Sequence, residues 1–275
     1  MNKRKIMTLI KFMILLVVAG TMLIPMLWSL SISLQPPGVA FQFPPKFFQP
    51  PLLFENYKTV FTSFNFMRYT FNSLLICICA IVGAIISNSM IAFGLAKYES
   101  KGLNRLFFIG LCTMYIPSVT MMVPSFVLWS KIKALDTYFP LILPAFFGSI
   151  SWIFFMRQNF KGISNAFFEA AYIDGATPIY IFWKIYMPLS KPTIAYIALM
   201  AFLDRWNDMM GPLLYITSKD KYPIALALAS FRHEFMGREE LNMAATMMTI
   251  FPILVVYIFL QKHFVAGLQS AGVKE

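Results

Sequence analysis

The chain has 275 residues, of which 59% are hydrophobic and 13% are charged; its formal net charge is +11 and its mean hydropathy is +0.67. Soluble domains have about 25% charged residues, so this composition excludes an ordinary soluble domain and indicates a polytopic membrane protein. The basic residues lie in short segments between apolar runs, a pattern that indicates membrane topology and predicts no nucleic-acid partner.

Six apolar runs are long enough to cross a bilayer as helices, each of which needs about 20 residues. They are Phe12–Leu34, Phe71–Leu95, Leu106–Trp129, Phe139–Met156, Thr193–Leu214 and Met243–Gln261. The sequence therefore predicts an all-α polytopic membrane protein, with six transmembrane helices in a single domain over residues 1–275.

The first run follows the basic segment MNKRKIM, and no small-residue cleavage site follows the run, so we predict an uncleaved helix. With its amino end in the cytoplasm, thirteen basic residues fall in cytoplasmic segments and nine in outer segments. This difference has the sign of the positive-inside rule. Both termini are therefore predicted to be cytoplasmic.

Two outer segments differ in their expected structure. Residues 35–69 contain the proline-rich, aromatic stretch QPPGVAFQFPPKFFQPP, a composition typical of extended chain. Residues 217–242 are long enough for a short helix at the membrane interface.

The cytoplasmic segment 159–192 has the pattern of a short helix, a sharp break and a second helical piece. Residues 165–174 would form a helix of about 15 Å, which is too short to span the membrane. Ser164 can cap its start, Gly175 can end it and Pro178 prevents a simple continuation. The helix is apolar almost all round, so protein or lipid must cover it. It has no Lys or Arg, which an interfacial helix would carry, and this favours docking on a protein.

A charged cluster interrupts the fifth run in the stretch FLDRWNDMMGP. Ionisable groups at membrane depth are costly and usually face a cavity or a partner. Two interpretations are open. Trp206, Asn207 and Asp208 line or gate a pathway, or Asp204 and Arg205 pair with each other or with neighbours and fix the packing of the helix.

The sequence contains no recognisable catalytic or metal-binding motif. The dipeptide Gly-Lys is absent, which excludes a phosphate-binding loop of the Walker type. The stretch HEFMG lacks the second histidine of a zinc-protease helix, and Cys77, Cys79 and Cys112 do not have the spacing of a structural zinc site. We therefore predict no catalytic residue, no metal and no cofactor in this chain.

The stretch EAAYIDGATPIYIFWKIYMPLSKP resembles the EAA loop in the membrane-spanning subunits of binding-protein-dependent ABC importers. The positions of its Glu-Ala-Ala, Gly and Ile-x-x-Pro pattern are occupied by Glu169, Ala170, Ala171, Gly175, Ile185 and Pro188. Further stretches resemble the carbohydrate-importer branch and are similar to the second permease of maltose-type systems. They are MYIPSV from Met114, LDTYFPLIL from Leu135, WND from Trp206 and GLQSAGVKE from Gly267.

The resemblance implies a type I ABC importer permease in the cytoplasmic membrane of a bacterium or archaeon. Two homologous permease subunits would form the pathway, two ATPase subunits would bind ATP and Mg²⁺, and an extracellular or periplasmic solute-binding protein would deliver the ligand. Residues 169–175, which include Asp174, would form a coupling helix that enters a cleft of the ATPase. Ile185 and Pro188 would seat the following segment against the membrane domain.

A sugar or an oligosaccharide is the substrate class that the resemblance implies, with a polyol or a glycerol phosphate as the alternative. A secondary transporter is a rival class, but it would need no docking helix and would often show two related halves. A membrane enzyme would need a polar constellation near one face. A purely structural subunit that only docks an ATPase would tolerate substitution of Glu169 or Gly175 without loss of transport.

Overall fold

The computed structural model describes residues 3–98 and 100–271, which contain helices and no strand. The chain divides into two compact units: a first unit of residues 1–67 and 228–252, and a second unit of residues 68–227 and 253–275. The sequence predicts that both termini are cytoplasmic. Residues 1–2 and 272–275, which form these termini, lie outside the described residues. The same holds for the last part of the GLQSAGVKE stretch.

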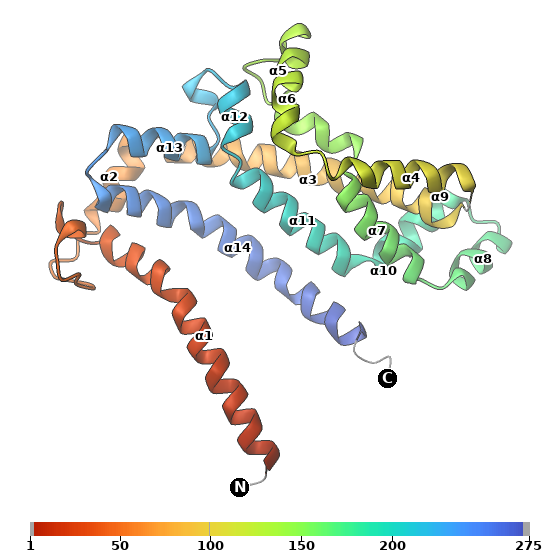
Figure 1. Ribbon diagram of the computed structural model, residues 1–275, viewed down its shortest axis with the longest axis horizontal. Helices are drawn as coiled ribbons and strands as arrows, with labels where there is room; N and C mark the ends of the chain where they lie inside the picture. The colour runs from red at the N-terminus through yellow and green to blue at the C-terminus, as the bar shows by residue number, and fades with distance from the viewer. Residues whose placement is uncertain (1–2, 99, 272–275) are drawn as a thin grey trace. The chain divides into compact units, whose positions relative to one another are not determined.

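Figure 1 shows the helices along the chain. The α-helices are α1 (Lys3–Ser33), α2 (Glu55–Ser63), α3 (Phe66–Lys97), α4 (Lys101–Thr113), α5 (Met122–Lys131), α6 (Phe139–Ile142), α7 (Ile150–Gly162), α8 (Asn165–Ile173), α9 (Pro178–Ile181), α10 (Met187–Leu189), α11 (Lys191–Trp206), α12 (Met210–Tyr215), α13 (Ile224–Glu234) and α14 (Glu239–Ala271). Four short 3₁₀ segments cover Val39–Phe41, Ser118–Met121, Leu143–Phe147 and Lys219–Lys221, and Phe182–Tyr186 forms a π-helical turn.

Among the described residues, four helices are long and apolar enough to cross a membrane, or up to six if each bent pair is one span. The four are Lys5–Ser33, Phe66–Lys97, Phe139–Gly162 and Glu239–Lys262. The bent pairs are Lys101–Thr113 with Ser118–Lys131, which meet at 96°, and Pro178–Leu189 with Lys191–Trp206, which meet at 80°. The protein is thus an all-α, multi-pass membrane protein.

Three of the expected spans are broken rather than continuous. The third is broken between Thr113 and Ser118, where its two helical parts meet at 96°. The fourth has a 3₁₀ segment in its first half and a break at Gly148, whose φ of +85° ends that segment before α7 begins. The fifth ends as a helix at Trp206, and α12 starts four residues further on, at Met210. Such breaks could not be predicted from hydropathy, because the residues on both sides of each break are equally apolar.

In the first unit, a buried polar cluster at the end of α1 fixes the proline-rich segment that follows. The Nδ2 amide of Asn56 donates to the carbonyls of Ser33 and Gln35, each at 3.0 Å, and the Gln35 Nε2 donates to the carbonyl of Lys46 at 3.0 Å. Asn56 belongs to α2, a helix that the composition of residues 35–69 did not predict. The segment is therefore tied to α1 and is only partly extended.

In the second unit, the core that positions the site is aromatic. The ring of Phe93 on α3 lies 6.1 Å from that of Phe160 on α7, and 5.3 Å and 5.1 Å from the rings of Phe182 and Tyr186. The guanidinium of Arg157 donates to the carbonyl of Leu95 at 3.2 Å. The end of α3, α7 and the π-helical turn therefore pack as one group.

Candidate functional site

Helix α8 is bounded by two local capping motifs. At its start, the Ser164 hydroxyl accepts a hydrogen bond from the amide of Ala166 at 3.3 Å, as predicted. At its end, the amide of Ala176 donates to the carbonyl of Ala171, and that of Gly175 to the carbonyl of Tyr172, each at 3.0 Å. This is the double hydrogen bond of a Schellman motif, which requires a left-handed residue. Gly175 supplies it with a φ of +82°.

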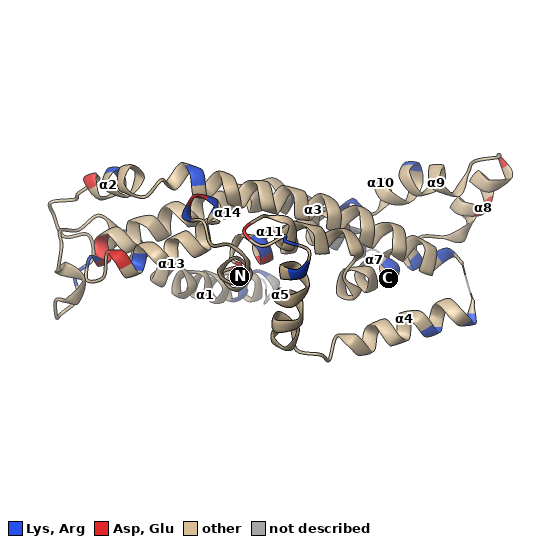
Figure 2. Cartoon of the chain, turned by 90° about the horizontal axis from the view of Figure 1, so that it is seen from above, with Lys and Arg blue, Asp and Glu red and all other residues tan. Residues whose placement is uncertain are grey.

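Most of the apolar surface of α8 is exposed. The helix has no buried residue, and Phe167, Tyr172 and Ile173 are 53%, 60% and 83% exposed. Figures 1 and 2 show that α8 projects beyond the ends of α7 and α9, and Figure 2 shows acidic but no basic residues on it. A short apolar helix in such a position has a surface that a partner can cover.

One side of α8 is nevertheless anchored to the core of the second unit. The ring of Phe168 lies 6.2 Å from the ring of Phe93. The Nζ of Lys97, at the end of α3, donates to the Oδ1 of Asn165 at 2.7 Å and lies 4.6 Å from the ring centroid of Tyr186. Movement of α8 would therefore act directly on α3 and, through Lys97, on the π-helical turn.

The predicted residues of the loop divide between two elements. Glu169, Ala170, Asp174 and Gly175 are exposed on or after α8, and Ala171 is half-buried. A hollow of about 560 Å³ is lined by Ala171, Asp174, Gly175, Ala176, Thr177 and Tyr180.

The last three of these lining residues were not predicted. The sequence could have indicated Thr177, because a threonine followed by a proline is typical of a helix start. In the structure, its hydroxyl accepts from the amide of Tyr180 at 3.3 Å, and Pro178 begins α9. Ala176 and Tyr180 carry no such signal.

Ile185 and Pro188 lie on the element after α8. Ile185 is in the π-helical turn Phe182–Tyr186 and packs, half-buried, against the aromatic core, whereas Pro188 is exposed in α10. A π-helical turn inside helical structure often marks a functional position. The structure thus places Ile185, but not Pro188, at the contact between the loop and the core.

The charged cluster in the fifth span forms its own network at the end of α11. Arg205 lies 3.8 Å from a carboxylate oxygen of Asp204, as one interpretation predicts, and 3.6 Å from one of Asp208. The other Asp208 oxygen accepts from the amide of Gly211, in the first turn of α12, at 2.9 Å. Trp206 is 1% exposed and stacks on Phe202 at 5.2 Å, and the exposed Asn207 donates to the carbonyl of Leu203.

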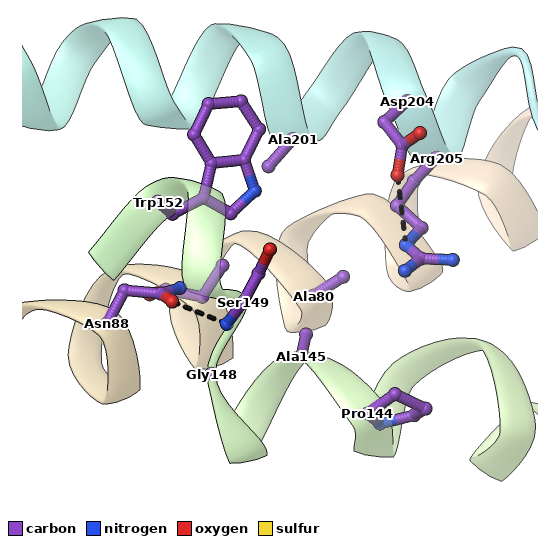
Figure 3. Close-up of a pocket in the computed structure, with 11 residues that line it drawn as sticks. Ala80, Asn88, Pro144, Ala145, Gly148, Ser149, Trp152, Ala201, Asp204 and Arg205 are labelled. Carbon is purple, nitrogen blue, oxygen red and sulfur yellow. Dashed lines mark hydrogen bonds and ion pairs between the residues drawn. The ribbon is translucent and has the colours of Figure 1, made fainter. Parts of the chain in front are cut away.

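A cavity of about 300 Å³ lies beside this network, and Figure 3 shows its lining. It is lined by Ala80, Ala84, Asn88, Pro144, Ala145, Gly148, Ser149, Trp152, Ala201, Asp204 and Arg205. Of the charged stretch, Asp204 and Arg205 line the cavity. The assignment of Trp206, Asn207 and Asp208 to a pathway or gate stays a prediction. Within the described residues, no group of three or more His, Cys, Asp or Glu could hold a metal ion.

Asp136 is the centre of a second network, which joins residues far apart in the sequence. Its carboxylate accepts from the amides of Thr217 and Ser218 at 3.0 and 2.9 Å, and from the Ser218 hydroxyl at 2.7 Å. The Lys221 ammonium lies 2.8 Å from the same carboxylate. The hydrogen bond from Lys221, followed by those from Ser218, holds the pKa of Asp136 well below its usual range.

We expect Asp136→Asn to loosen the junction between residues 132–138 and 216–222. A bound carboxylate stabilises the folded state fully above the ordinary aspartate pKa of about 4, and this stabilisation is lost progressively as the pH falls from there through the lowered folded pKa. The variant should thus lower the melting temperature at pH 7 by a few degrees, on the order of 2–5 °C. This group should cause no change in the wild-type melting temperature between pH 7 and pH 5, because its full stabilisation is present throughout that range. Thermal unfolding of the purified wild type and variant at both pH values checks this.

The model of the family described as "Binding-protein-dependent transport system inner membrane component" matches residues 81–270, which contain α8, its capping turn and every residue that lines the cavity except Ala80. The chain belongs to this family. It is a permease component of a binding-protein-dependent ABC importer, and its fold is that of the type I importer permeases.

Known permeases are similar to this one over most of their length. The arabinooligosaccharides transport system permease protein AraQ of Halalkalibacterium halodurans is 35% identical over 224 residues, which cover 81% of this chain and 80% of the relative. The trehalose transport system permease protein SugB of Mycobacterium tuberculosis is 31% identical over 261 residues, 94% of each chain. A chain of the crystal structure of a bacterial ABC transporter involved in the import of the acidic polysaccharide alginate matches with a TM-score of 0.81 and 26% identity, over 96% of this permease and 98% of that chain.

Proposed function

We propose that this permease forms half of the translocation pathway of an ATP-driven importer for a sugar or oligosaccharide. A second, homologous permease subunit would form the other half, and an extracellular solute-binding protein would deliver the solute. The family description supports the binding protein. The carbohydrate class is supported by the relatives, whose names specify arabinooligosaccharides and trehalose.

In this proposal, α8 is the coupling helix, and two ATPase subunits on the cytoplasmic side bind ATP and Mg²⁺ and dock on it. The observation that carries the proposal is that α8 exposes Phe167, Tyr172 and Ile173 while Phe168 anchors it to the core. A helix on the lipid headgroups would need basic residues along its polar edge, and α8 has none.

The charge and shape around α8 suit a protein partner. Glu169 and Asp174 are exposed, so a basic surface on the ATPase would complement them. The small side chains of Ala170 and Ala171 allow close approach, and the hollow that begins at Ala171 lies beside them. Closure of the ATPases would then push α8, and Phe93 would pass the movement to α3.

Inactivation of the partner ATPases tests this function. With the phosphate-binding lysine of both ATPase subunits replaced by alanine, proteoliposomes that hold the whole importer and its binding protein should take up no radiolabelled sugar above background. The reason is that this permease has no ATP-hydrolysing motif of its own. Uptake that persists in these vesicles, driven by an ion gradient, would identify a secondary transporter instead.

A further inference from the structure

The 300 Å³ cavity shown in Figure 3 lies near the middle of two predicted membrane spans. Ala80, Ala84 and Asn88 come from the central part of α3, which covers Phe66–Lys97, and Ser149 and Trp152 lie next to the midpoint of the span Phe139–Gly162. Polar residues at such a depth are rare and usually face a pathway.

The cavity also lies where a helix is broken, and glycines fix the break against α3. Gly148 has a φ of +85°, and a Cβ there would come within 2.9 Å of Ile91. A Cβ on Gly83 would come within 2.6 Å of the Phe146 ring. Backbone that leaves helical geometry at membrane depth occurs where protein buries it or where it lines a cavity. The close packing at these glycines therefore fixes the break in place beside the cavity.

Hydrogen bonds across the break hold the lining in place. The Oδ1 of the buried Asn88 accepts from the amide of Ser149 at 2.7 Å, and the Ser87 hydroxyl donates to the carbonyl of Ala145 at 2.9 Å. Ser149 is thereby fixed at the start of α7, and Trp152 follows it one turn later. The indole of Trp152 packs edge-on against the ring of Tyr196, with the ring centroids 6.3 Å apart. The indole is half-buried and lies beside Ala201 of α11.

The charge of the site is defined by Arg205. Its guanidinium lies within ion-pair distance of both Asp204, at 3.8 Å, and Asp208, at 3.6 Å. One positive and two negative groups give a formal charge of −1. An anionic ligand would therefore meet a guanidinium that is already compensated and an excess of negative charge, and like charges in a partly dehydrated site repel strongly.

We propose that this cavity is a subsite for one neutral sugar unit of the transported solute, and that it discriminates against uronic acids. The indole of Trp152 provides an apolar face for the sugar ring, and Ser149 and Asp204 provide hydrogen-bond partners for its hydroxyl groups. A volume of about 300 Å³ suits one unit of a chain rather than a whole oligosaccharide. The subsite rests on the proposed function, because it assumes that the importer carries a sugar.

Equilibrium binding to the purified complex of permeases and ATPases, without the binding protein, tests the subsite. The probes are arabinotriose and trehalose, which are neutral, and trigalacturonate, which is acidic. The wild type should bind a neutral probe more tightly than trigalacturonate. Trp152→Leu should raise the Kd of the neutral probe about five- to tenfold, and Trp152→Phe, which keeps a ring, should restore most of the affinity.

Two further variants separate a subsite from a merely structural role. Phe108→Leu removes an aromatic side chain that is 67% exposed on α4 and lies outside the cavity, and it should leave the Kd unchanged. Asp208→Asn removes one negative charge and keeps a side-chain oxygen that can accept from the amide of Gly211. It should narrow the difference in affinity between neutral and acidic probes, and this variant carries the test if Trp152→Leu does not assemble.

The proposal is overturned if the wild type binds no neutral probe, if it prefers trigalacturonate, or if Trp152→Leu and Phe108→Leu have the same Kd. Uptake of the same probes by proteoliposomes with the binding protein is measured in parallel. ATP-driven uptake of a neutral probe without binding at this cavity would contradict the subsite and leave the proposed function standing. Absence of ATP-driven uptake of all three probes would contradict sugar import itself.

Discussion

Replacement of Gly175 by valine is expected to lower both solute uptake and transport-coupled ATP hydrolysis by more than about tenfold. Gly175 has a φ of +82°, a conformation that a β-branched residue adopts only at a cost of about 1–3 kcal/mol. Relief of this strain would break the hydrogen bonds of Gly175 and Ala176 to the last turn of α8 and turn the helix away from its partner. Both rates are measured on the whole importer in proteoliposomes with its binding protein.

Gly237 provides a matched control for this substitution. It has a φ of +85°, and as at Gly175, no atom lies within 4 Å of a Cβ added there. Gly237→Val therefore introduces the same backbone strain in the turn between α13 and α14, which belongs to the first unit, whereas α8 belongs to the second. Equal losses of transport in the two variants would mean that strain at any turn is sufficient, and the special role of the α8 turn would be contradicted.

A positive charge on the exposed face of α8 should separate the permease from its ATPases. Ile173 is 83% exposed, so Ile173→Lys removes almost no contact within this chain and should leave its folding intact. In the docked complex, the lysine would bury an unpaired charge, which costs several kcal/mol. We expect ATPase subunits to be lost during affinity purification of the permease, and uptake to fall to background.

The control for this charge is Met236, which is 82% exposed in the turn after α13. Met236→Lys adds the same charge to a side chain of nearly equal exposure, and the ATPase subunits should still co-purify in full. Retention of the ATPases by the Ile173→Lys variant would show that this face of α8 is covered by something else.

The parts of the fold that depend on neighbouring residues could be predicted from the sequence. Ser164 and Gly175 lie at the two ends of α8 and form hydrogen bonds with its first and last turns, so their roles follow from local chemistry. The apolar runs indicate spans for a similar reason, because about 20 residues in a row determine whether a helix can cross a membrane.

The parts that depend on distant residues could not be predicted. The partners of Asp136 are 81 to 85 positions further along the chain, and no local pattern connects them. The cavity joins residues of α3, α7 and α11, and its lining includes Ala80 and Ala145, which have no chemistry that a motif could record. Trp206 illustrates the same limit, because its place in an apolar run did not reveal that the indole is buried against Phe202.

Site-specific cross-linking from α8 tests the central claim most directly. A photo-reactive phenylalanine derivative is placed at position 173, and at position 236 as a control, in the purified importer reconstituted in lipid. Illumination of the variant at position 173 should join the permease covalently to an ATPase subunit, which mass spectrometry of the product identifies, and the variant at position 236 should give no such product. Cross-linking of position 173 to lipid alone, with every ATPase subunit present and unmodified, would contradict the assignment of α8 as the helix through which ATP-driven motion reaches the membrane.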